Sequence, residues 1–144
     1  MMNWLEKKAV LVPIYFSDSA FAAVAPARSF VKDTNQLHLI HVLPPLHPTD
    51  PAVIWNTVSN ESREQQVEAA LRDRLTELGY EEANVTVVVG NPFTAILQYA
   101  RSHGIDLIVV PAQDEEEGVL THFLFGSLAE QLARSASCPV LVIR

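Results

Sequence analysis

The chain has 144 residues, of which 49% are hydrophobic and 19% are charged, a composition typical of a globular protein and not of a disordered one. Its formal net charge of −7 makes the phosphate backbone of a nucleic acid an unsuitable partner. No apolar run approaches the ~20 residues of a membrane-spanning helix, and the first residues lack the basic start and apolar core of a secretory signal. The single cysteine, Cys138, suits a reducing compartment. We therefore expect a cytoplasmic protein with neither a membrane nor a nucleic-acid partner.

Short apolar strands alternate along the chain with helical segments. Helix N-cap residues follow the first apolar run, and Gly79 and Gly104 stand where two later helices should end. Pro92 is placed to begin a helix. The predicted strands are 9–14, 37–43, 85–89, 105–110 and 140–143, and the predicted helices are about 17–31, 60–78, 92–102 and about 121–135.

This alternation predicts a single α/β domain over residues 1–144. Strands that are apolar on both faces, each followed by a helix, are typical of a parallel sheet covered on both sides. The fold class is therefore a doubly wound domain with a five-stranded, mainly parallel sheet. In such sheets ligands bind beyond the carboxyl ends of the strands, where the strand order reverses.

The connection over residues 44–59 interrupts this regular alternation. It contains four prolines and one large aromatic residue, Trp55. One interpretation is a surface excursion with Trp55 packed on the body of the protein. The other is a lid or a partner-binding loop.

Several segments share residues with a known family. They are Val-Pro-Ile-Tyr-Phe-Ser-Asp-Ser at 12–19, Leu-His-Leu-Ile-His-Val at 37–42, Gly-Asn-Pro at 90–92, Gly-Ile-Asp-Leu-Ile-Val-Val at 104–110, Phe-Gly-Ser-Leu-Ala-Glu at 125–130 and Ser-Cys-Pro-Val-Leu-Val at 137–142. In this order and spacing, the chain from about residue 8 to 144 resembles the universal stress protein family. The resemblance implies an adenine nucleotide alpha hydrolase-like fold, stress-linked regulation in the cytoplasm and a homodimer. It also implies that some relatives bind ATP or AMP at the reversal of strand order.

The adenine end of that nucleotide site is only partly kept. In the ATP-binding members that the chain resembles, an aspartate two residues after the first-strand proline contacts the adenine. Here the proline is Pro13 and the aspartate position holds Tyr15, which has no anionic acceptor. The second-strand valine beside the adenine is kept as Val42.

The phosphate end departs further from the family pattern. That pattern is Gly, two residues, Gly, nine residues, Gly and Ser or Thr, because only a backbone without Cβ can wrap closely around phosphates. Here Pro111 takes the first glycine position, the second glycine is missing, and only Gly126 and Ser127 match the end. The four carboxylates of residues 114–117 repel a polyphosphate by ~1 kcal/mol or more per close pair.

We therefore expect no bound cofactor and a degenerate nucleotide site. In the alternative, ATP or AMP binds through a modified phosphate loop, with Mg²⁺ bridging the acidic residues to the phosphates. The residues that such a ligand would use are Pro13, Tyr15, Val42, Pro111, Gly126 and Ser127.

No catalytic or metal site is predicted elsewhere in the chain. His38 and His41 are three residues apart on a strand, so they point to opposite faces and do not chelate one metal together. Cys138 is interpreted as a small buried hydrophobic residue and not as a redox thiol. Ser17, Ser19 and Ser127 are explained as residues that cap helices. The protein is therefore not expected to be an enzyme.

The last strand is the predicted dimer interface. It is apolar and ends the sequence, so at a sheet edge it offers a template for pairing. The resemblance implies an isologous dimer through this strand. Its residues are Val140, Leu141, Val142 and Ile143.

Two functions follow from these observations. The first is a non-catalytic stress-response regulator or adaptor that acts as a homodimer on a protein partner not yet known. The alternative is a stress switch that binds ATP or AMP. An enzyme on the same scaffold would require converging reactive groups after the strands, and the sequence offers none.

Overall fold

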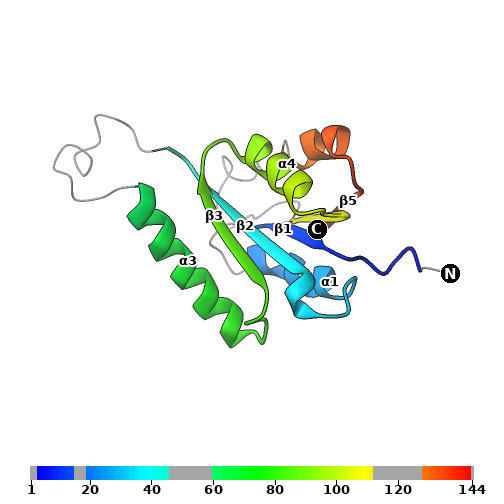
Figure 1. The fold of residues 1–144 in the computed structure, drawn as a ribbon, viewed down its shortest axis with the longest axis horizontal. Coiled ribbons are helices and arrows are strands. Elements are labelled where there is room, and N and C mark those ends of the chain that lie inside the picture. The colour runs from blue at the N-terminus through cyan, green and yellow to red at the C-terminus, as the bar shows by residue number, and fades with distance from the viewer. Residues whose placement is uncertain (1–2, 15–18, 46–59, 112–127, 144) are drawn as a thin grey trace.

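A computed structural model describes residues 3–14, 19–45, 60–111 and 128–143 of the chain. Within these ranges it forms a five-stranded sheet in the order β3-β2-β1-β4-β5, and every neighbouring pair is parallel (Figure 1). The strands are β1 (Val10–Pro13), β2 (Leu37–Leu43), β3 (Asn84–Val89), β4 (Leu107–Pro111) and β5 (Val140–Ile143). The predicted doubly wound α/β fold is confirmed.

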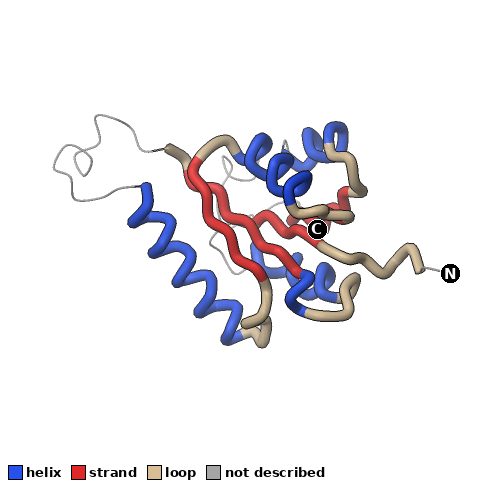
Figure 2. Tube along the Cα trace, viewed as in Figure 1, coloured by secondary structure: helices blue, strands red, loops and turns tan. Residues whose placement is uncertain are grey.

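Helices cover both faces of the sheet (Figure 2). The α-helices are α1 (Val24–Arg28), α3 (Asn60–Glu77) and α4 (Pro92–Ser102), together with helical residues 128–135; the short 3₁₀ segments are η1 (Ser19–Ala23) and η2 (Thr34–Gln36). Helices α1 and α3 pack on one face, and α4 and residues 128–135 pack on the other. None of the helices in the described part of the chain has the length and apolar character needed to cross a lipid bilayer.

The two faces of the sheet bury separate cores. Val10 and Val12 of β1 face the core beneath α1 and α3, whereas Leu11 faces the core beneath α4, and all three are fully buried. Successive side chains of one strand therefore pack into opposite cores. This explains why the strands are continuous apolar runs and do not alternate between apolar and polar residues.

Helix α4 has clear signals at both ends. The side chain of Asn91 accepts a hydrogen bond from the backbone N–H of Thr94 at 3.1 Å, as an N-cap residue does. After its last turn Gly104 takes a left-handed conformation with φ of 61°, and the N–H of Ile105 donates to the carbonyl of Ala100 at 3.0 Å. This closing turn satisfies a carbonyl that the helix leaves unpaired.

The helix predicted at about 17–31 is shorter than expected. In the described residues it consists of η1 and then α1, which ends at Arg28. The guanidinium of Arg28 donates from Nη1 to the carbonyl of Val31 at 2.6 Å and from Nη2 to the carbonyl of Lys32 at 3.1 Å. These bonds hold the chain in a turn after Arg28, and the prediction of a helix through residue 31 was wrong.

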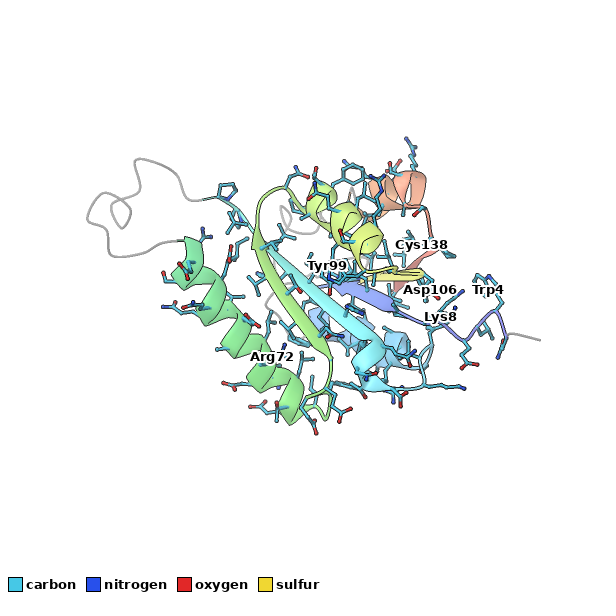
Figure 3. The ribbon with its side chains drawn as sticks, in the orientation of Figure 1. Trp4, Lys8, Arg72, Tyr99, Asp106 and Cys138 are labelled. Atoms are coloured by element: carbon cyan, nitrogen blue, oxygen red, sulfur yellow. The ribbon has the colours of Figure 1, made fainter. Side chains whose placement is uncertain are left out.

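The strand predicted at 105–110 begins at Leu107 and extends to Pro111. Ile105 completes the closing turn of α4, and Asp106 joins the starts of β1 and β4 (Figure 3). Its carboxylate accepts the N–H of Lys8 at 2.9 Å and of Ala9 at 3.1 Å, while its own N–H donates to the carbonyl of Ala9 at 3.0 Å. The backbone of Ile105 is therefore used to close α4, and β4 begins only at Leu107.

Two predicted segments fall partly outside the described residues. Of the helix predicted at about 121–135, residues 128–135 are described and are helical. Of the connection at 44–59, only residues 44 and 45 are described, so the choice between a surface excursion and a lid stays open.

Candidate functional site

The candidate site lies where the strand order reverses, between β1 and β4. Both strands end in proline, Pro13 on β1 and Pro111 on β4, and both residues are buried. The two strands pair at Val10 with Leu107 and at the following residue of each strand, so the pairing lies in the amino-terminal half of both strands. Because proline has no backbone N–H, neither strand can donate a hydrogen bond to this ladder from its last residue.

Val42 stands beside the carboxyl end of β1. Pro13 is in register with Ile40, and the N–H of Ile14 donates to the carbonyl of Ile40 at 2.9 Å. Strand β2 then continues through Val42, which is half-buried on the α4 face of the sheet. Val42 is thus positioned just beyond the last described residue of β1.

His41 fastens the end of β1 to β2. Its Nδ1 lies 2.7 Å from the carbonyl oxygen of Ile14, and because a carbonyl only accepts, Nδ1 carries the proton. Burial lowers the pKa of His41, and the hydrogen bond to Ile14 opposes this shift without cancelling it. A neutral imidazole therefore borders the point where the chain leaves β1, a feature that the sequence analysis did not identify.

The structure brings together part of the predicted nucleotide set. Pro13 on β1, Val42 on β2 and Pro111 on β4 all lie at the carboxyl ends of neighbouring strands. Tyr15, Gly126 and Ser127 lie outside the described residues, as does the acidic stretch 114–117. The described part of the site offers backbone and apolar contacts.

The metal-ligating residue types in the described ranges do not converge. Within those ranges no group of three or more His, Cys, Asp and Glu residues is arranged to hold a metal ion. His38 contacts Tyr99 of α4, whereas His41 bonds the end of β1. Cys138 was expected to be buried, but it is only half-buried. Burial is the larger cause that raises the pKa of its thiol, and the carboxylate of Asp106 is the second.

The predicted interface residues lie along an edge of the sheet. Among the described strands β5 pairs only with β4, in a register that runs from Ile108 with Val140 to Pro111 with Ile143. Val142 is 41% exposed, and the other three β5 side chains are half-buried. An apolar edge strand of this kind can pair with another strand.

The architecture defines a class, the doubly wound α/β domains with a ligand position at the strand reversal. Within that class, the sequence model of the universal stress protein family matches residues 7–144. The chain belongs to the universal stress protein family, as its resemblance to that family predicted.

Individual relatives agree with this assignment. The stress response protein NhaX of Bacillus subtilis is 26% identical, over 96% of this chain and 90% of its own length. The structure of the universal stress protein UspA from Lactobacillus plantarum superposes with a TM-score of 0.67 at 24% identity, covering 96% of this chain and 99% of that one. An Arabidopsis thaliana family member with AMP bound gives a TM-score of 0.59 at 19% identity, covering 94% of this chain and 90% of its own.

Proposed function

We propose that this chain is a non-catalytic stress-response protein that acts in the cytoplasm as a homodimer through β5. It would regulate a protein partner by contact, and its nucleotide site would be degenerate, with no resident cofactor. Membership of the universal stress protein family supports the stress-response role. The observation that carries the proposal is the apolar edge strand β5 with its exposed Val142.

The edge position of β5 supports a symmetric interface. Two copies related by a two-fold axis would each present the same strand, so Val142 would be buried against the partner copy. Leu141 and Ile143 face the core beneath α1 and α3, and Val140 faces the other core. Side chains on both faces of the strand are therefore already ordered before pairing, which reduces the entropy lost on association.

Pro111 supports the degenerate site. A phosphate loop presents backbone N–H groups to the ligand and needs glycine conformations to do so. Pro111 instead has no N–H and a φ fixed near −65°, and it is buried as the last residue of β4. One of the donors that a polyphosphate requires is therefore missing at the start of the loop.

The alternative is a switch that binds ATP or AMP. It is favoured by Pro13 and Val42, which lie at the strand ends where the family places adenine contacts. The AMP-bound Arabidopsis relative supports it as well, since it shares the fold. Against it stand Pro111 and the sequence at Tyr15.

The dimer proposal is tested by Val142→Asp with Leu78→Asp as the matched control. Each side chain is 41% exposed, but Leu78 follows the end of α3 and does not belong to β5. Full burial of a valine contributes about 1.5–3 kcal/mol, so burying the exposed part of two Val142 side chains contributes about 1–2.5 kcal/mol. That alone corresponds to a dimer about 5- to 60-fold weaker, and a carboxylate facing its symmetry mate weakens it further.

Sedimentation velocity at micromolar concentrations measures the outcome. We expect Val142→Asp to sediment as a monomer while the wild type and Leu78→Asp remain dimers. A wild-type monomer, or a Val142→Asp dimer as tight as the wild type, contradicts the proposed interface.

A further inference from the structure

A second cluster lies toward the amino-terminal ends of the strands, away from the candidate site, on the face covered by α4. Nδ1 of His38, near the start of β2, is 2.7 Å from the hydroxyl oxygen of Tyr99 on α4. The Tyr99 ring stacks on the imidazole of His103, with centroids 3.8 Å apart and an angle of 11° between the planes. The centroids of the two imidazoles are 5.9 Å apart. Figure 3 shows Tyr99 between α4 and the sheet.

The cluster joins three elements through Tyr99. The hydroxyl of Thr86 on β3 also bonds the Tyr99 hydroxyl, so one buried phenol connects β3, β2 and α4. Nδ1 of His103 lies 3.1 Å from the carbonyl oxygen of Tyr99 and therefore donates to it. The three side chains differ in exposure to solvent: Tyr99 is 8% exposed, His38 is half-buried and His103 is exposed.

Protonation changes this arrangement. A neutral His38 can accept the Tyr99 proton at Nδ1, whereas an imidazolium has no acceptor nitrogen and must donate there. Tyr99 must then turn its own proton toward Thr86, and a half-buried positive charge stands beside a second imidazole. Burial lowers the pKa of His38, and the charge of His103 lowers it further.

The neighbours of His38 do not compensate a positive charge. On α4 the titratable groups that face it are Tyr99 and His103. In the register, Asn84 of β3 and Leu11 of β1 stand beside it, and both are uncharged. Among the described residues, no carboxylate contributes to the shift in the pKa of His38.

We propose that His38, Tyr99 and His103 form an acid-sensitive clasp that holds the last turn of α4 on β2 and opens as the pH falls. The two imidazoles repel when both are charged, and His38 ceases to accept the Tyr99 proton. The consequence is local. The turn that loosens contributes Tyr99, Ala100 and Ile105 to the core beneath α4, while the core beneath α1 and α3 stays packed.

Proton NMR of the full chain tests the clasp through the titration of each imidazole. We expect His38 to titrate below pH 6.5 and its midpoint to rise in His103→Asn, because the like charge that lowers the pKa of His38 is removed. Arg101→Gln is the control, since it removes a positive charge from the same turn of α4 and leaves the clasp intact. A midpoint that does not move in His103→Asn, or that moves as far in Arg101→Gln, overturns the proposal.

Hydrogen exchange provides the second readout. After correction for intrinsic rates, the amides of His103 and Ile105, which bond the carbonyls of Tyr99 and Ala100, should exchange at least ten-fold faster at pH 5 than at pH 7. In His103→Asn this acceleration should shrink several-fold. Equal protection of these amides at both pH values in the wild type refutes the opening.

Discussion

Replacement of Asp106 should destabilise the protein strongly, although the residue lies far from the candidate site. Its carboxylate accepts the N–H groups of Lys8 and Ala9, at 2.9 and 3.1 Å. A hydrogen bond to a charged group contributes about 1.5–3 kcal/mol. The bond to Lys8 is exposed, so water replaces it in part. We therefore expect Asp106→Ala to lower the free energy of unfolding by about 2–4 kcal/mol, and Asp106→Asn, which keeps one acceptor oxygen, by about 1–2 kcal/mol.

Urea denaturation at one fixed protein concentration measures these losses. With a slope of about 2 kcal/mol per molar urea, Asp106→Ala should move the midpoint down by about 1–2 M. Asp73→Ala, an exposed aspartate on α3, is the control and should change stability by less than about 0.5 kcal/mol. An Asp106→Ala midpoint equal to that of Asp73→Ala refutes the reasoning that this carboxylate joins β1 to β4.

Two further predictions concern pH and backbone conformation. Burial lowers the pKa of both His38 and His41 below the ordinary value of 6.5, so between the lowered values and about 6.5 the unfolded chain binds more protons than the folded chain. Their stabilising contribution is present in full above about pH 6.5 and is lost as the pH falls. The decline in urea midpoint from pH 7.5 to 5.5 should therefore be smaller in His41→Asn. An unchanged decline contradicts the assignment of this pH dependence to His41. The Cβ of Gly104→Ala meets no atom of the described residues within 4 Å. The φ of 61° at Gly104 should nevertheless cost about 1–2 kcal/mol in thermal or urea unfolding; a neutral result means that the turn does not need a left-handed residue.

The sequence predicted most of the elements because local signals agreed with the final packing. The bounds of β2 were predicted correctly because its apolar residues pack against both cores. Helix α4 was predicted correctly because Pro92 and Gly104 mark its ends. The start of β4 was missed because Ile105 is apolar and buried but its backbone belongs to the turn that closes α4.

The site was predictable only in outline. The fold rule placed the site beyond the carboxyl ends of the strands, and the family resemblance pointed to Pro13 and Pro111 there. The bond between His41 and Ile14 spans 27 residues of sequence, and that between His38 and Tyr99 spans 61. Such contacts follow from how the elements pack, and the single signal in the sequence was the spacing of Tyr99 and His103, four apart on one helix face.

A degenerate site, as we propose for this chain, should hold no nucleotide at the strand reversal. The most direct test is to purify the protein without added nucleotide, denature it and analyse the released material for ATP, ADP and AMP. The same preparation is then titrated with millimolar ATP and Mg²⁺ while its melting temperature is followed, since a ligand of the folded state must raise it. We expect no released nucleotide and no shift in the melting temperature. Stoichiometric nucleotide, or a rise that grows with ATP concentration, contradicts the degenerate site and establishes the switch in its place.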